Sequence, residues 1–216
     1  MWKDILLIAA PIATAVGTVV LATLTLISTR RLGRQEERKQ VANIVEKVVS
    51  PLIGKLGTKI SALKRGEYLF FRNQAVDCNA TKKLSDDLFS EENKVFCEDF
   101  QEREGKVWKA VESHDDEAQK LEYTLNILEK TIYTSDGLYG ELRQRYGATF
   151  ATDVRGVMLE RINLPIGGKD IPAFLKNSEE YRIVVEHHNK LEDISISLKK
   201  DLEKIRRKWR RKYKIP

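Results

Sequence analysis

The chain has 216 residues and combines 38 Lys and Arg with 32 Asp and Glu, which gives a formal net charge of +6 at pH 7. Charged residues make up 32% of the sequence and aromatic residues 8%, a balance that is typical of long, solvent-exposed helices. No internal repeat or low-complexity tract occurs, so repeat arrays are excluded. The two cysteines, Cys78 and Cys97, form no CxxC pair, and in a cytoplasmic body we expect both to be reduced and partly buried.

The N-terminal segment is the most apolar part of the chain. The 23 residues from 5 to 27 contain no charged side chain, and a helix of that length extends roughly 34 Å, enough to cross a hydrocarbon core. Arginines follow directly at Arg30 and Arg31. A cleaved signal peptide has a shorter apolar run, and a buried core helix without charges is unusual at this length. We therefore predict a transmembrane helix over residues 5–28.

The flanks of this segment predict its orientation. Residues 30–39 carry five basic side chains and two carboxylates, whereas the side-chain charges of residues 1–4 cancel. Basic residues close to a membrane end are retained in the cytoplasm. We expect residues 1–4 to form a short extracytoplasmic leader and residues 29–216 a cytoplasmic domain, in a single-pass protein of the cell membrane. The flank of the anchor then consists of Arg30, Arg31 and Arg34.

One face of the predicted span carries only small residues. Because they recur every four positions, they share one side of a helix, where small residues let two helix backbones approach closely. The alternative is a chance alignment, since alanine and threonine are common in such segments. The face predicts self-association or pairing with another spanning helix, through Ala10, Thr14, Thr18 and Ala22.

Three further segments have the apolar spacing of amphipathic helices, over about residues 34–64, 91–133 and 178–212. In the first, Pro51 is expected to kink or split the helix. The other two carry heptad seams, whose apolar side chains must pack on each other, on the first helix or on a second copy of the chain. The predicted fold class is mainly α, with an antiparallel helical bundle or coiled-coil hairpin following the membrane helix.

An insert at about 134–177 is punctuated by glycine and proline and separates the last two helices. Within it, Asp153 is a candidate N-cap for a short helix. Another short helix is expected in residues 66–89, around Tyr68.

No motif predicts catalysis, a cofactor or a metal site. Gly54-Lys55 and the glycine pair before Lys169 lack the spacing of a phosphate loop and indicate turns. His114 and His188 lie on the seams and are expected to pack there, and the acidic run of residues 115–117 is expected to be solvated.

The C-terminal helix end, over about residues 199–216, is the strongest candidate for binding. Ten basic and two acidic residues give it a local charge of +8, more than that of the whole chain. An anionic lipid surface or a nucleic acid would neutralise this charge, and a solvated helix end is the third possibility. The candidate residues for an anionic partner are Arg206, Arg207, Lys208, Trp209, Arg210, Arg211, Lys212 and Lys214.

Three functions are compatible with these features. The leading one is a non-enzymatic, membrane-anchored scaffold that binds protein partners, or a second copy of itself, through the heptad seams. The alternatives are a membrane-tethered nucleic-acid-binding protein that uses the basic end, and an enzyme with a site near the 134–177 insert.

Overall fold

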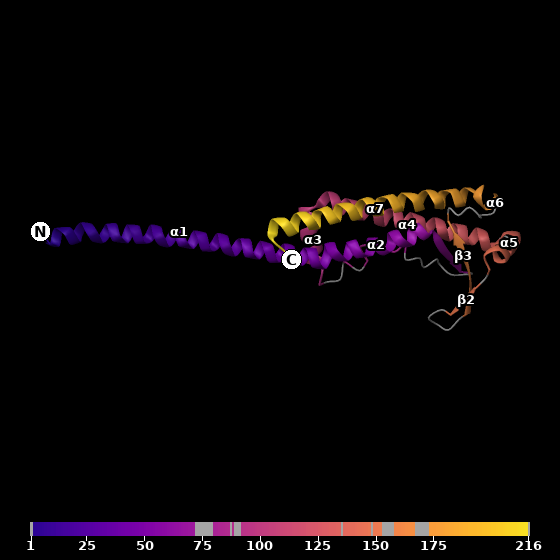
Figure 1. Cartoon of the computed structure of the whole chain (residues 1–216), viewed down its shortest axis with the longest axis horizontal. Coiled ribbons are helices and arrows are strands. Elements are labelled where there is room, and N and C mark those ends of the chain that lie inside the picture. Colours follow the sequence, from indigo (N-terminus) through magenta and orange to yellow (C-terminus); the bar gives the residue numbers. More distant parts are fainter. Residues whose placement is uncertain are drawn as a thin grey trace. The chain divides into compact units, whose positions relative to one another are not determined.

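The computed structural model describes residues 2–71, 80–86, 88, 92–134, 136–147, 149–152, 158–166 and 173–215 (Figure 1). It is mainly helical. In chain order the elements are α1 (Trp2–Ile44), the π-helix η1 (Val45–Val49), α2 (Ser50–Arg65), β1 (Glu67–Phe71), α3 (Lys94–Arg103), α4 (Gly105–Thr134), α5 (Asp136–Tyr146), β2 (Thr149–Thr152), β3 (Met158–Pro165), α6 (Ala173–Lys176) and α7 (Glu179–Tyr213). The chain divides into two compact units, residues 44–208 and residues 1–43 with 209–216.

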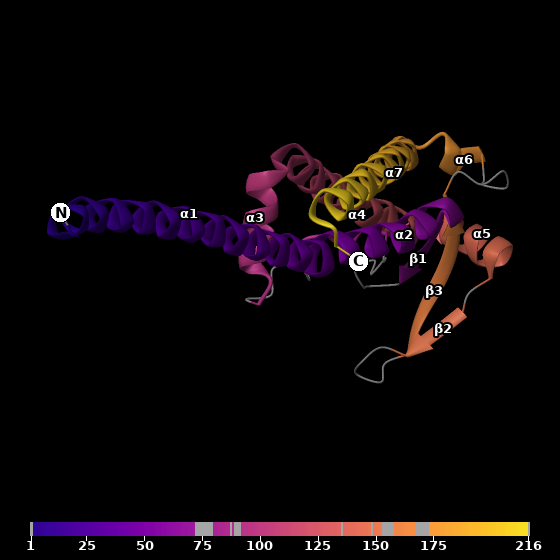
Figure 2. The ribbon, with the colours of Figure 1, turned by 60° about the vertical axis from the view of Figure 1, so that its left-hand side comes forward.

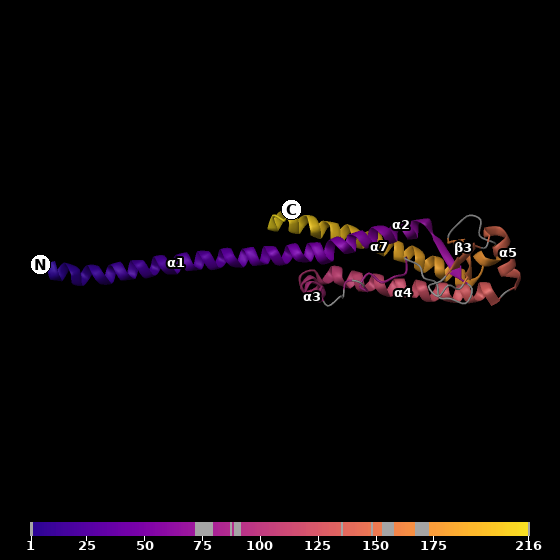
Figure 3. The ribbon, with the colours of Figure 1, turned by 90° about the horizontal axis from the view of Figure 1, so that it is seen from below.

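The larger unit, residues 44–208, is built on a helical bundle. Within it, α2, α4 and the first thirty residues of α7 lie side by side, and α7 runs antiparallel to the other two (Figures 1 and 3). The two predicted heptad seams face this bundle. On α4 and α7 the buried seam residues are Val111, His114, Ala118, Leu121, Leu125, Leu128, Ile132, Tyr181, Val184, His188, Leu191, Ser195, Leu198, Leu202 and Ile205.

The start of α7 agrees with the sequence prediction. The Ser178 hydroxyl accepts a hydrogen bond from the Tyr181 amide at 3.2 Å, which satisfies one of the N–H groups left open in the first turn. Glu179 and Glu180 follow in that turn, where carboxylates interact favourably with the helix dipole. The predicted boundary of the third helix is thereby confirmed.

A three-stranded antiparallel sheet of order β1-β3-β2 lies at one end of the bundle, next to α5 (Figure 2). Gly66 makes the turn from α2 into β1. Its φ of 62° favours glycine, and a Cβ there would lie 2.8 Å from the carbonyl oxygen of Ile166. On β3, Ile162 and Leu164 are buried and Asn163 between them is exposed, the alternation of a half-buried strand.

The sequence predicted two short helices, one in residues 66–89 around Tyr68 and one after Asp153, and both predictions are wrong. Tyr68 lies in β1 and is buried, because a run of aromatic residues after Gly66 suits a pleated strand better than a helix. The helix expected after Asp153 would include Met158 and Ile162, which instead belong to β3. Asp153 itself lies outside the described residues.

The single helix predicted over residues 91–133 is also wrong. It is divided at Glu104, whose φ of −133° and ψ of 48° end α3, and α4 begins at Gly105. Glycine is a weak helix former, and the break lets the rings of Phe100 and Trp108 meet edge to face at 6.2 Å.

Pro51 does not split the helix in which it lies. A π-helical turn, η1, directly precedes α2, and the Ser50 amide donates to the carbonyl of Val45, five residues back. Because proline lacks an N–H and its ring crowds the carbonyl four residues before it, a widened turn lets the helical path continue. Gly54, expected in a turn, lies inside α2.

Helix α1 is continuous over Trp2–Ile44, and its side chains are described from Thr18 onward. Within the described residues, no helix is both long and apolar enough to cross a membrane. The transmembrane segment 5–28 therefore remains a prediction. Of the small-residue face, the side chains of Ala10 and Thr14 lie outside the description, and Thr18 and Ala22 are exposed.

Candidate functional site

The basic C-terminal end of α7 closes with a specific backbone motif. The amide of Ile215 donates to the carbonyl of Arg210 at 3.1 Å, and Lys214 between them has a φ of 51°. This is the Schellman arrangement, in which glycine normally occupies the left-handed position. Among the described residues, Lys214 is the one non-glycine residue with a positive φ.

The smaller unit, residues 1–43 with 209–216, brings this helix end against the flank of the predicted anchor. The guanidinium of Arg38 donates to the carbonyl of Lys214 at 2.6 Å. The hydroxyl of Tyr213 donates to Glu37 Oε1 at 2.8 Å and accepts a hydrogen bond from Lys212 Nζ at 2.9 Å. Two segments more than 170 positions apart therefore form one polar surface.

These contacts surround a cleft of about 450 Å³. Four basic side chains line it together with one carboxylate, and the carboxylate is already hydrogen-bonded to a tyrosine hydroxyl. We call this feature the basic cleft; its lining residues are Arg34, Gln35, Glu37, Arg38, Lys212, Tyr213 and Lys214.

The residues predicted to bind an anionic partner do not form one group. Lys212 and Lys214 line the basic cleft, while Arg210 and Arg211 are exposed nearby in the same unit. In the larger unit, Lys208 is 3.4 Å from Glu104.

The other residues predicted to bind an anionic partner also differ in their contacts and exposure. Arg207 is 3.9 Å from Glu203, and Arg206 is half-buried. Trp209 is only 4% exposed, so it offers little surface to an anionic partner and continues the apolar seam of α7. From the anchor flank, Arg34 lines the cleft, whereas Arg30 and Arg31 are exposed on α1.

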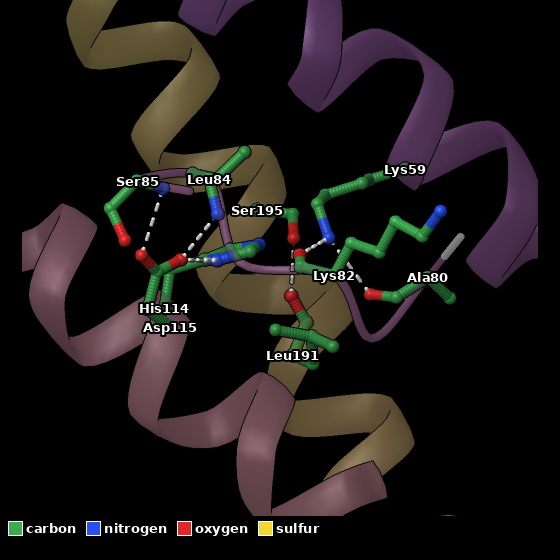
Figure 4. Close-up of polar contacts among 9 residues, drawn as sticks. All are labelled: Lys59, Ala80, Lys82, Leu84, Ser85, His114, Asp115, Leu191 and Ser195. Carbon is green, nitrogen blue, oxygen red and sulfur yellow. Dashed lines mark hydrogen bonds and ion pairs between the residues drawn. The ribbon is translucent and has the colours of Figure 1, made fainter. Parts of the chain in front are cut away.

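A second polar cluster lies inside the larger unit, where the segment of residues 80–86 crosses the bundle (Figure 4). The carboxylate of Asp115 accepts hydrogen bonds from the amides of Leu84 at 2.7 Å and Ser85 at 3.0 Å. From α2, the ammonium of Lys59 reaches the carbonyls of Ala80, at 3.1 Å, and Lys82. Asp115 thus accepts hydrogen bonds from the N–H groups of this segment, and Lys59 donates to its carbonyl groups.

The two histidines on the seams are packed as predicted. His114 is fully buried, its Nδ1 lies 3.1 Å from Asp115, and burial lowers its pKa despite that carboxylate. His188 Nδ1 lies 2.7 Å from the hydroxyl of Tyr68, and burial likewise lowers its pKa, opposed by Glu192. Both imidazoles are therefore neutral at pH 7.

The acidic run after His114 is not solvated as expected. Asp115 is 7% exposed and Glu117 is 2% exposed; only Asp116 between them faces solvent. Burial opposes ionisation of both, but hydrogen bonds outweigh it and lower the pKa of each. For Asp115 these come from His114 and the 84–85 segment.

Glu117 is held by polar side chains of α7. His187 Nδ1 lies 2.6 Å and Lys190 Nζ 3.1 Å from its carboxylate, and Lys120 Nζ on α4 lies 3.7 Å from it. These contacts offset the burial of the carboxylate. The sequence signal that was missed is position: Asp115 and Glu117 flank the seam residues His114 and Ala118 and so lie at the edge of the bundle interface.

The described residues contain no group of three or more His, Cys, Asp and Glu side chains that could hold a metal ion. Cys97 is a buried free thiol whose pKa is raised by burial and by Glu98, while Cys78 and Lys169 with its glycines lie outside the description. Comparison of the chain with protein-family models, curated proteins and solved structures finds no match.

Proposed function

We propose that this chain is a single-pass, membrane-anchored helical protein that acts as a non-enzymatic scaffold. The observation that carries the proposal is the exposure of apolar side chains on α1. Seven of them are between 42% and 66% exposed: Val19, Val20, Leu21, Leu24, Leu26, Ile27 and Leu32.

These side chains do not form one stripe that a neighbouring helix could cover. Val19, Val20 and Leu21 are consecutive, and consecutive residues of a helix project about 100° apart. A helix that is apolar on several sides is buried in a core or a bilayer, since exposure to water costs about 25 cal/mol per Å² of apolar surface. A bilayer would cover every side at once.

Local hydrogen bonds make this part of α1 compatible with lipid. The hydroxyls of Thr23 and Thr25 donate to the carbonyls of Val19 and Leu21, each at 2.8 Å. The threonines then present no unsatisfied donor to a hydrocarbon environment. Together with the absence of charged residues over 5–17, this supports a span over residues 5–28. The basic residues that follow support a cytoplasmic body.

The scaffold role requires a surface for partners. The heptad seams are buried within one chain, so we place the proposed contact on the outer face of α4. There Tyr123 is 67% and Ile127 36% exposed, and Tyr123 lines a groove of about 460 Å³ together with His187 of α7. Large aromatic side chains on a polar surface are frequent anchors for protein partners.

Alkaline extraction of membranes from cells that produce the full chain tests the anchor. We expect the protein to remain in the membrane pellet at high pH, and to leave it when Leu21 and Leu24 are both replaced by Arg. The matched control is Glu36 and Lys39 both replaced by Ala, changes in the exposed flank that leave the apolar segment intact. Release of the unmodified chain into the soluble fraction would contradict the proposal.

Crosslinking and mass spectrometry of the full chain in its native membrane tests the scaffold role. We expect intermolecular links to lysines near the α4 groove, such as Lys120, and their loss in a Tyr123→Lys variant. Lys200 is an exposed site on α7 away from this groove and serves as the control for nonspecific links. Links confined to Lys200 and its neighbours would place the partner elsewhere.

A further inference from the structure

We propose that the basic cleft binds the phosphomonoester of an anionic lipid headgroup. This inference rests on the proposed membrane anchor, because it assigns a lipid to the cytoplasmic end of that anchor. The cleft volume of about 450 Å³ lies within the range of small-ligand sites.

The charge of the basic cleft suits an anion with more than one negative charge. Arg34, Arg38, Lys212 and Lys214 supply four cations, and Glu37 is the one carboxylate in the lining. A phosphomonoester carries close to two negative charges at neutral pH, whereas the phosphodiester of an ordinary phospholipid carries one. Arginine also offers two parallel N–H groups to phosphate oxygens.

The carboxylate in the lining is engaged within the cleft. Glu37 Oε1 accepts the Tyr213 hydroxyl at 2.8 Å, and that hydroxyl in turn accepts a hydrogen bond from Lys212 at 2.9 Å. The ammonium of Lys212 also lies 4.7 Å from the centre of the Tyr213 ring. Glu37 therefore positions the C-terminal residues of α7, and this ordering is in place before any ligand arrives.

The carboxyl end of a helix normally repels anions, because its open carbonyls carry partial negative charge. Here Arg38 donates to the carbonyl of Lys214 and the amide of Ile215 donates to that of Arg210. One terminal carbonyl of the helix, that of Arg210, and the carbonyl of the following residue, Lys214, are thereby satisfied, and Lys212 and Lys214 line the cleft.

The backbone at Lys214 provides an observation that is independent of charge. Glycine is the usual residue at the left-handed position of a Schellman motif, and a residue with a Cβ is less favourable there. A lysine at this position lowers local stability but adds a fourth cation to the lining. Strained backbone of this kind is concentrated at functional sites.

The place of the cleft along α1 favours a headgroup that projects into water. Arg34 and Arg38 follow Ile27 by seven and eleven residues, roughly 10 and 16 Å along a helix. These positions lie beyond the average headgroup layer, which adds about 5–8 Å on each side of the hydrocarbon core. A phosphate carried on a sugar or polyol headgroup reaches that height.

The first experiment titrates the full chain, in a neutral detergent, with inositol 1,4-bisphosphate, using isothermal calorimetry. Binding should weaken roughly tenfold in Lys214→Gly and in Arg38→Gln, the loss expected for one charge-assisted contact to phosphate. Lys214→Gly is the sharper variant, because glycine suits the left-handed backbone and leaves the fold intact.

Two matched variants remove a charge without touching the lining. Arg211→Ala removes an exposed cation of the same unit, and Lys200→Ala removes one from the larger unit. We expect less than a twofold change in each. Equal losses in Lys214→Gly and Arg211→Ala would overturn the proposal, because they would show a diffuse electrostatic effect. Tighter binding of a single-stranded oligonucleotide than of the bisphosphate, with the same variant pattern, would also overturn it.

The second experiment identifies the source of the phosphate. The full chain is reconstituted in phosphatidylcholine nanodiscs containing phosphatidylinositol 4-phosphate or phosphatidylglycerol at equal total charge, and retained lipids are identified by native mass spectrometry. Selective retention of the phosphomonoester lipid, lost in Lys214→Gly, is the expected result. Equal retention of both lipids overturns the headgroup assignment while the anchor stands. Failure of the chain to insert, with bisphosphate binding intact, removes the anchor and assigns the cleft to a soluble phosphoester.

Discussion

Two charged segments, the acidic run of residues 115–117 on α4 and the basic run of residues 210–214 on α7, have opposite environments. In the acidic run the outer two carboxylates are buried: Asp115 binds backbone amides of another segment, and Glu117 binds Lys190 of α7. In the basic run Arg210, Arg211 and Lys214 are exposed. The first run therefore contributes to stability, and the second is available to a ligand.

The difference shows that the position of a charged run relative to the apolar seam, and not its composition, decides whether its side chains are buried or exposed. Asp115 and Glu117 flank residues that pack in the bundle, so they are drawn to its edge and need partners there. Trp209 is the last seam residue of α7, and beyond it the helix has no further apolar position to bury.

The largest expected effect is the loss of the Asp115 carboxylate. Asp115→Ala leaves the amides of Leu84 and Ser85 without their acceptor in a buried place, and the free energy of unfolding should fall by about 3 kcal/mol. Urea denaturation of the full chain in neutral detergent, followed by circular dichroism, measures it. Asp116→Ala is the control and should change stability by less than about 0.5 kcal/mol. A similar loss of unfolding free energy in both variants would contradict the difference between the buried and the exposed carboxylate.

A smaller effect is expected from acidification. The pKa values of His114 and His188 are lowered in the folded state, so the unfolded chain binds more protons below about pH 6.5. The histidine contribution is complete above that pH and is lost as the pH falls. We expect the urea midpoint to decrease from pH 7 to pH 5.

The carboxylates titrate in a separate, lower window. Asp115 and Glu117 have lowered pKa values, so their contribution is present above about pH 4 and is lost as the pH falls through their folded values. Replacing His188 by Asn should reduce the loss of stability between pH 7 and pH 5 and leave the loss at lower pH unchanged. An unchanged slope between pH 7 and pH 5 would show that other groups titrate.

Substitutions in the basic run should affect binding and leave stability almost unchanged. Arg210 and Arg211 are exposed, so replacing both by Ala should change the free energy of unfolding by less than about 0.5 kcal/mol. The same double variant should weaken the attraction of the full chain, held in phosphatidylcholine nanodiscs, to anionic vesicles, by about 1 kcal/mol per residue, a long-range effect that is separate from binding in the basic cleft. Cosedimentation of the loaded nanodiscs with the vesicles at low and high salt measures this, and salt-independent binding would contradict an electrostatic role.

One small expected effect on folding has the opposite sign. Lys214→Gly should raise the free energy of unfolding slightly, by up to about 1 kcal/mol, because glycine adopts a φ of 51° without strain. Urea denaturation beside a Lys200→Ala control detects it. A decrease in stability would mean that the Lys214 side chain supports the fold.

The periodicities of the chain predicted the long helical segments and the core residues of the two seams, but not the break between α3 and α4. The seams of α4 and α7 are buried nearly position by position, and Ser178 begins α7 as its side chain indicated. Such features depend on residues three or four apart, so a local pattern contains them. The strands β1 and β3 were missed because their pairing joins Tyr68 to Leu164, far apart in sequence.

What the sequence by itself determined is a mainly helical chain with two heptad seams, an uncharged N-terminal segment and a basic end. Only the tertiary structure decided which charges are used internally and which remain available. Asp115 acquired its role from a backbone segment thirty positions away, and the basic cleft exists because Arg38 meets Lys214 across 176 positions. Contacts at such separations depend on how the chain folds back, which local spacing does not encode.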